Sequence, residues 1–164
     1  MDFHDCFFLW GAVAIIGGIL AIRNSFYIVV VNGVSMSPTL ECGDRVLVFR
    51  YWPKKLVRPG QIVVVQRPTY ILDANDTINL QNTPIIKRVL GTAGDTITTY
   101  FYDLPFPERS NQIAAYDDEG KRVWKVPTGH IFIKGDSIGT DSLTWGPVPL
   151  SQMFGVVITD LNAQ

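Results

Sequence analysis

The sequence is poor in cysteine and carries almost no net charge. Its 164 residues include two cysteines, and the formal net charge is -1. Cys6 and Cys42 are too few for a disulfide framework, and neither lies in a metal-ligand spacing. A near-neutral chain also lacks the excess of basic residues that nucleic-acid binding requires. We therefore expect neither a cysteine-based metal site nor a nucleic-acid partner.

Repeats, low-complexity linkers and long amphipathic helices are also missing after residue 25. A content of 47% hydrophobic and 18% charged residues fits a single domain with a substantial core. Short β-branched runs, bounded mostly by Gly, Pro or Asp, predict an all-β barrel or sandwich rather than a parallel sheet. The predicted strands are 26–31, 45–50, 62–66, 85–90, 96–102, 122–126, 130–134 and 154–159. Segments 67–84 and 103–120 are predicted to be irregular excursions.

One long hydrophobic run lies near the start of the chain. Residues 7–22 contain no charge, and as a helix they would span roughly 24 Å, against about 30 Å of hydrocarbon core. Gly17 and Gly18 are poor choices for a soluble helix but are common in membranes, and Arg23 can snorkel to the interface. The alternatives are a buried core helix or a removed secretory signal, for which a basic start and a cleavage site are lacking. We expect a retained anchor at 1–25, in contact with membrane lipid, and a β-rich domain at 26–164.

A turn of small and polar residues follows the first predicted strand. Residues 32–40 read Asn-Gly-Val-Ser-Met-Ser-Pro-Thr-Leu. Gly33 allows a close approach of neighbouring backbone, and Pro38 stiffens the exit from the turn. Ser35 and Ser37 place hydroxyl groups at a strand end, so one of them is a candidate nucleophile. The same composition is also typical of an ordinary turn.

Two adjacent cations lie inside the predicted strand 85–90. Because strand side chains alternate, Lys87 shares a face with Ile85 and Val89, while Arg88 lies on the other face. A lysine desolvated by apolar neighbours can become a neutral amine and act as a base, whereas arginine keeps its proton. The alternative is that both cations are solvated charges on a strand.

A polar turn follows the predicted strand 130–134. Residues 135–142 are dense in hydroxyl and carboxylate groups, and a Gly-Pro corner begins at Gly146. Such a turn can orient a base that comes from elsewhere in the chain. His130 suggests a Ser-His-Asp arrangement, but it starts an apolar strand beside Gly129, which favours a structural role.

Together, these motifs resemble the ordered boxes of the type I signal peptidases. The matching stretches are 33–40, 43–46, 86–91 with 94–95, and 135–136 with 141–142 and 146–149. They occur in the family's order and cover the chain from the anchor to about residue 157. The resemblance implies a serine endopeptidase with a mostly β core on one N-terminal transmembrane helix. It also implies a Ser35 nucleophile and a Lys87 general base, without metal or cofactor.

The resemblance implies further site residues and a substrate. The expected substrates are precursor proteins with cleavable sorting peptides, with small residues one and three positions before the cut. Supporting residues around the Ser-Lys pair are Gly135, Asp136, Ser137, Thr140, Asp141 and Ser142. The residues expected to bind substrate are Val30, Gly33, Val34, Met36 and Ile86.

Three positions depart from the family pattern. The third box usually has a Ser two residues before the Asp and an Arg two residues after it, and here those positions hold Gly139 and Leu143. Thr140 or Ser137 is therefore expected to orient the lysine, and Asp141 is left without its usual Arg. Position 33 is Gly where many bacterial members have a hydroxyl. The oxyanion hole is thus expected to consist of the Ser35 backbone N–H and one other donor.

Lys87 also bears on the branch of the family, because the endoplasmic-reticulum branch has His there. A single anchor, a compact core and the run 125–136 look most like the mitochondrial inner-membrane peptidases, the second subunit especially. This implies a domain in the intermembrane space and a second peptidase subunit as candidate partner, although Arg23 weakly favours the opposite orientation. The alternatives are a compact bacterial enzyme of the inner membrane, a non-catalytic partner subunit, and a self-cleaving regulator. The last would need a DNA-binding domain.

Overall fold

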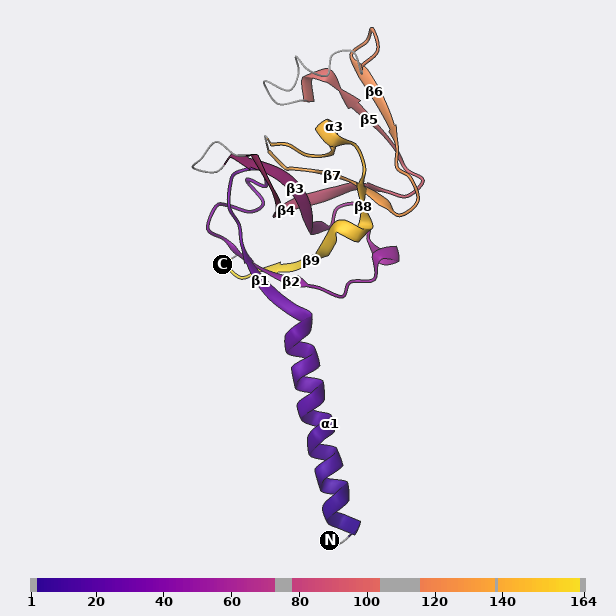
Figure 1. The fold of residues 1–164 in the computed structure, drawn as a ribbon. Coiled ribbons are helices and arrows are strands. Elements are labelled where there is room, and N and C mark those ends of the chain that lie inside the picture. The colour runs from indigo at the N-terminus through magenta and orange to yellow at the C-terminus, as the bar shows by residue number, and fades with distance from the viewer. Residues whose placement is uncertain (1–2, 73–77, 104–115, 138, 163–164) are drawn as a thin grey trace.

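The computed structural model describes residues 3–72, 78–103, 116–137 and 139–162. It has one N-terminal helix that stands away from a mostly β body (Figure 1). The helix, α1 (Phe3–Ser25), ends where the first strand, β1 (Phe26–Val30), begins. The prediction that the chain is mostly β is confirmed.

The helix α1 exposes apolar side chains to its surroundings, among them Ile15, Leu20 and Ile22. It meets the body at its C-terminal end, where Arg50 N–H donates to Ser25 O at 2.8 Å. Of the helices that the structure describes, none is both long and apolar enough to count as a membrane span. The anchor at 1–25 stays a prediction.

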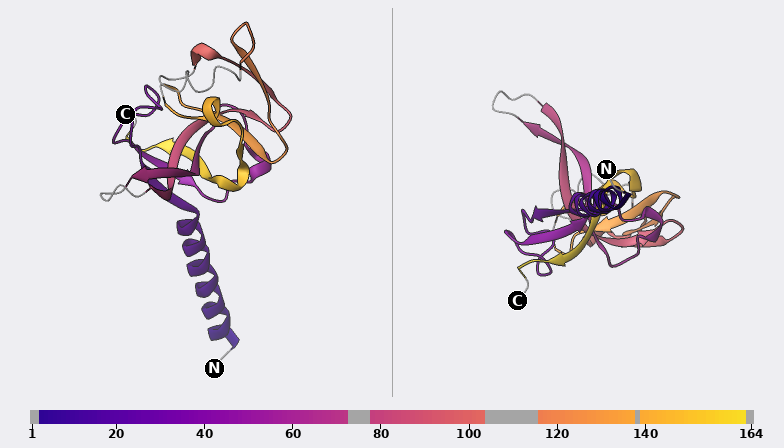
Figure 2. Two further views of the ribbon diagram at one scale, coloured as in Figure 1. Left: turned by 45° about the horizontal axis from the view of Figure 1, so that its top comes forward. Right: turned by 90° about the horizontal axis from the view of Figure 1, so that it is seen from below.

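Seven strands form one curled, open antiparallel sheet in the order β1-β2-β9-β3-β4-β7-β8, and β5 and β6 form a separate pair (Figures 1 and 2). In the described residues β1 and β8 are the two edges, so the sheet resembles half of a barrel and is not closed. The strands after β1 are β2 (Arg45–Phe49), β3 (Ile62–Leu72), β4 (Ile78–Thr92), β5 (Thr96–Tyr100), β6 (Lys121–Lys125), β7 (His130–Lys134), β8 (Val148–Pro149) and β9 (Met153–Asp160).

The prediction of an irregular segment at 67–84 is wrong for the residues that the structure describes there. β3 and β4 continue as a long hairpin whose register runs from Ile62↔Arg88 to Leu72↔Ile78. Cross-strand pairing continues through Pro68 and Pro84 and keeps the hairpin extended. Of the second predicted excursion, Asp103 ends the short helix η2 (Phe101–Asp103), and residues 104–115 lie outside the described part.

Four short elements had no counterpart in the sequence prediction. They are too short for a periodic pattern to reveal. They are the strand β8 and the helices η1 (Lys54–Leu56), α3 (Ser142–Trp145) and η4 (Leu150–Gln152).

The strand β3 separates two apolar clusters. Val63 and Val65 belong to one cluster, called here the inner cluster, which also contains Val89 of β4. Val64 belongs to the outer cluster, which contains Met36 of the turn after β1. Because successive strand side chains point to opposite faces, β3 is buried on both sides. The outer cluster thereby holds the turn 32–40 against the sheet next to β4.

Candidate active site

Strand β4 brings a lysine into the protein interior. Lys87 is only 4% exposed and shares its face of the strand with Ile85 and Val89, which pack in the inner cluster. Its neighbour Arg88 faces the other way and keeps 28% of its side chain exposed. Of the two adjacent cations, the desolvated one is therefore the lysine, which can give up its proton.

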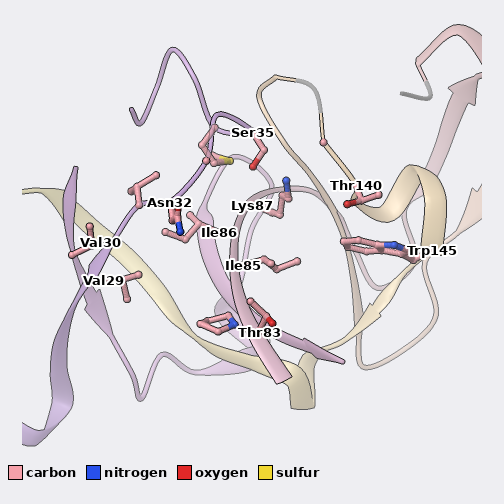
Figure 3. A pocket seen from close by; sticks show the side chains of 15 residues that line it. Val29, Val30, Asn32, Ser35, Thr83, Ile85, Ile86, Lys87, Thr140 and Trp145 are labelled. Atoms are coloured by element: carbon pink, nitrogen blue, oxygen red, sulfur yellow. The ribbon is translucent and has the colours of Figure 1, made fainter. Parts of the chain in front are cut away.

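Ser35 lies in the turn after β1, and its hydroxyl and the Lys87 amine point toward one another (Figure 3). The loop after β7 closes over both residues. Ser137 N–H donates to Ser35 O at 3.0 Å. A Cβ added at Gly135 would lie 2.5 Å from Ser35 O and 3.1 Å from Lys87 Nζ. A Cβ added at Gly139 would lie 2.9 Å from Ser35 Cβ and 3.3 Å from Lys87 Nζ. Glycine at these two positions therefore allows the loop backbone to lie next to Ser35 and Lys87.

Burial changes the protonation of Lys87. Desolvation lowers the pKa of its amine, because the buried ammonium loses its hydration. The carboxylates of Asp141 and Asp136 raise the same pKa, with smaller effects. The net direction is downward, which favours the neutral amine that a general base requires.

Arg88 connects three segments around the pair, a role that the sequence prediction missed. Its Nε donates to Asp136 Oδ1 at 2.7 Å and its Nη2 to Asp136 Oδ2 at 2.5 Å. It also donates to Gly60 O at 3.0 Å and to Thr39 Oγ1 at 3.1 Å. The hydrogen bond from Arg88 holds the pKa of Asp136 below its usual range. Arg88 thus joins the turn 32–40 to the loop after β7, and the Lys-Arg pair was its only sequence signal.

Asp141 and Ser142 are buried and shape this loop. Asp141 is 1% exposed, and its carboxylate accepts N–H bonds from Gly135 and Leu143, both at 2.9 Å. It caps α3, while Ser142 Oγ accepts the Ile133 N–H at 3.0 Å. Burial raises the pKa of Asp141 more than these bonds lower it. Within the described residues, no ion pair reaches Asp141.

A cavity of about 740 Å³ opens beside the Ser-Lys pair. Val34, which was expected there, is 62% exposed and is not among the lining residues. The sequence prediction did not include Asn32, Thr83, Ile85 or Trp145. Strand alternation from Lys87 could have indicated Thr83 and Ile85, whereas nothing indicated Trp145. The lining consists of residues 29–33, Ser35, Met36, residues 83–87, Gly139, Thr140 and Trp145.

The two competing candidates lie outside this lining. Ser37 Oγ donates to Glu41 Oε1 at 2.8 Å. His130 lies at the start of β7, with Nδ1 3.1 Å from Thr128 O. In the part of the chain that the structure covers, no three His, Cys, Asp or Glu side chains are grouped so that they could hold a metal ion. The arrangement suits a serine nucleophile with a lysine base.

Comparison with known proteins gives several relatives, among them mitochondrial inner membrane proteases and signal peptidases. A mitochondrial ATP-independent inner membrane protease subunit 1b from Arabidopsis thaliana is 35% identical over 77% of this chain and 64% of its own length. Mitochondrial inner membrane protease subunit 2 from Danio rerio is 33% identical over 79% of this chain and 60% of its own length. The chain thus spans somewhat less than two thirds of these relatives. Signal peptidase I V from Bacillus subtilis (strain 168) is 29% identical over 92% of this chain and 94% of its own length.

The family comparison covers all of the segments that line the cavity. The model of the family described as signal peptidase, peptidase S26, matches residues 6–160. This range includes the turn with Ser35, the strand with Lys87 and the loop after β7. The chain belongs to the signal peptidase family, peptidase S26.

Proposed function

We propose that this protein is a membrane-bound serine endopeptidase that removes sorting peptides from precursor proteins. The observation that carries this proposal is the hydroxyl of Ser35 facing the buried Lys87 beside an open cavity. The names of its relatives, which are signal peptidases and inner membrane proteases, support the same activity.

The reaction uses Ser35 as nucleophile and Lys87 as base. Neutral Lys87 takes the hydroxyl proton while Ser35 Oγ attacks the scissile carbonyl carbon. Lys87 then delivers that proton to the leaving amine, and an acyl-enzyme remains. A water molecule then loses a proton to Lys87 and attacks the ester carbonyl. The bond from that carbon to Ser35 Oγ breaks, Lys87 returns the proton to Oγ, and the new carboxyl end is released. The lowered pKa of Lys87 makes the base available without a histidine.

Two further groups assist this chemistry. The backbone N–H of Ser35 and one other donor stabilise the oxyanion of the tetrahedral intermediate. Thr140 takes the role of the hydroxyl that orients Lys87, because its side-chain oxygen lies toward the lysine side of the cavity (Figure 3). Ser137 contributes through its backbone bond to Ser35 O.

The substrate binds as an extended strand with small residues one and three positions before the cut. Val30, Met36 and Ile86 give the pocket for these residues an apolar wall. The substrate is added along strand edges that border the cavity, and β1 is one of them.

The cellular setting of this proposal is the mitochondrial inner membrane, with α1 as a single-pass anchor and the β body in the intermembrane space. The apolar run 7–22 and the names of the mitochondrial relatives support it. Those relatives are named subunits, so a second peptidase subunit is a candidate partner, and assignment to subunit 2 stays a prediction. A bacterial inner-membrane location is the alternative. Carbonate extraction, followed by protease protection of isolated mitochondria, tests anchor and orientation.

The test of the activity is a set of single substitutions in the full-length protein, assayed on a precursor. We expect Ser35→Ala, Lys87→Ala and Lys87→Arg each to abolish cleavage with normal folding, since arginine cannot give up its proton. Ser37→Ala and His130→Ala should retain cleavage. Near-normal activity of Lys87→Arg would refute the lysine base. The wild-type protein is assayed alone and again with a peptidase subunit from the same source. If the folded protein is inactive in both assays, this chain is better explained as a non-catalytic partner subunit.

A further inference from the structure

The cavity extends over both faces of one strand segment. Residues 83–87 of β4 all line it. Because strand side chains alternate, Thr83, Ile85 and Lys87 lie on one face, and Pro84 and Ile86 lie on the other. The cavity therefore has two halves, one on each face of β4.

The edge of β4 between these halves is open to an added strand. On one side, residues 84–88 pair with β3, from Gln66↔Pro84 to Ile62↔Arg88. On the other side, pairing with β7 begins only at Arg88↔Lys134. In the residues that the structure describes, no strand pairs with that side of β4 from Thr83 to Lys87. A peptide that binds there continues the sheet, and its side chains alternate between the same two faces as those of β4.

This alternation separates neighbouring substrate residues. The first and third residues before the cut enter the half that contains Val30 and Ile86, so the second must enter the opposite half. Ile85 and Trp145 lie in that opposite half, away from Val30 (Figure 3). We infer that the half-cavity of Thr83, Ile85 and Trp145 selects the second residue before the cut, and that it takes a bulky apolar side chain. The inference rests on the proposed function and adds to it a specificity-determining tryptophan.

The walls of this half-cavity determine its chemistry. Ile85 and Trp145 are partly buried and pack against the inner cluster, so they present a fixed apolar surface. Lys87 lies at the end nearest the cut. An acidic side chain there would stabilise the ammonium form of Lys87 and remove the base, while a basic side chain would be desolvated without an opposite charge, because Lys87 is neutral in the active enzyme. Leucine or phenylalanine has the size and polarity that fit.

The test uses the full-length protein and a peptide series with alanine at the first and third positions before the cut. The second position is Gly, Ala, Leu, Phe, Asp or Lys. We expect kcat/KM to be roughly tenfold higher for Leu or Phe than for Gly, since burial of such a side chain contributes a factor of this size. In Trp145→Ala this Leu-to-Gly ratio should fall to within about twofold.

Trp52→Ala is the matched control. Trp52 is also partly buried and packs against the same inner cluster, but it lies outside the cavity lining. Trp52→Ala removes the same side-chain volume from the same core as Trp145→Ala. This variant should therefore keep the wild-type ratio of kcat/KM for Leu over Gly. A ratio lowered equally in both variants would mean that core packing, not contact with substrate, causes the preference, and would overturn the inference.

A charge substitution gives a second test that does not remove core volume. Thr83 is half-buried in the lining, and Thr83→Asp should raise the Lys-to-Leu ratio at the second position about tenfold. The two peptides are compared within this one variant, because the added carboxylate also stabilises protonated Lys87 and lowers the activity on both. Cleavage of the series without preference at the second position, or a preference that appears only after the cut, would overturn the inference and leave the proposed function intact. Cleavage of no peptide and no precursor would instead contradict the proposed function, and with it the inference.

Discussion

Gly135→Ala tests how closely the loop after β7 must approach the nucleophile. The new methyl group would lie 2.5 Å from Ser35 O and 3.1 Å from Lys87 Nζ. Gly135 has no left-handed backbone conformation, so the effect is steric rather than conformational. The substitution therefore acts directly on the relative position of nucleophile and base.

The size of the effect follows from the contact distance. Carbon and oxygen atoms in close contact are normally about 3.3 Å apart, so the Ser35 carbonyl must move by roughly 0.8 Å. A misplacement of about 1 Å at a reacting group lowers the rate about 100-fold. Overpacking of this kind costs about 1–3 kcal/mol of unfolding free energy. We expect kcat/KM to fall about 100-fold and the melting temperature to fall by roughly 3–10 °C.

The chain offers a matched control at Gly155 in β9. A Cβ there would also lie 2.5 Å from a backbone carbonyl oxygen, that of Phe49, and again no left-handed conformation is involved. Gly155 is outside the cavity lining. Gly155→Ala should therefore lower the melting temperature by a similar amount but leave kcat/KM within about threefold of the wild type, because a clash distant from the site does not displace the reacting groups.

The assay is cleavage of a fluorogenic peptide by folded full-length protein, with thermal unfolding of the same samples. Equal losses of activity in Gly135→Ala and Gly155→Ala would refute the reasoning, since they would follow stability alone. So would a Gly135→Ala protein with wild-type kcat/KM, because the loop could then retreat from Ser35 without effect on catalysis.

Two further predictions concern the carboxylates. Asp136→Asn should lower the unfolding free energy by about 1–3 kcal/mol near neutral pH. Because Arg88 lowers the folded-state pKa of Asp136, this contribution is complete above the unfolded pKa of about 3.9 and disappears as pH falls through the folded pKa. Urea unfolding of the wild type and the variant at pH 7 and pH 3 measures the contribution. An equal difference in unfolding free energy at the two pH values would contradict the prediction. Asp141→Asn should shift the rising limb of kcat/KM to lower pH, because the Asp141 carboxylate raises the pKa of Lys87, and an unchanged pH profile would contradict this coupling.

The strand content could be predicted from the sequence because it depends on local patterns. β-branched runs indicated β1, β2, β7 and most of β9 to within one or two residues. The length of the β3–β4 hairpin and the position of β9 between β2 and β3 depend on pairing between distant residues. Local propensity does not encode such pairing.

The Ser-Lys pair that we propose could be chosen from the sequence for a related reason. Ser35 follows a strand within a short motif, and strand alternation alone places Lys87 among apolar residues. Thr39 and Trp145 reach the site only because the fold brings distant segments together. No spacing between motifs in the sequence indicates either contact.

The two departures in the third box have a common structural explanation. Leu143, at the position where the family usually has arginine, is 3% exposed and packs with Val126 and Phe132. A guanidinium there would have to give up its hydration among these apolar side chains, whereas Leu143 packs with them and Asp141 satisfies its carboxylate with backbone N–H groups. The cation that ties this loop to the sheet comes from Arg88 of β4.

The glycine at 139 is consistent with this arrangement. A serine there would bring a Cβ to 2.9 Å from Ser35 Cβ, so the family's usual hydroxyl does not fit while the loop stays this close to the nucleophile. With no side chain at that position, we propose that the hydroxyl that orients Lys87 comes from the next residue, Thr140, which lines the cavity. The glycine at 139 and the short distance between the loop and Ser35 are therefore two aspects of one arrangement of the site.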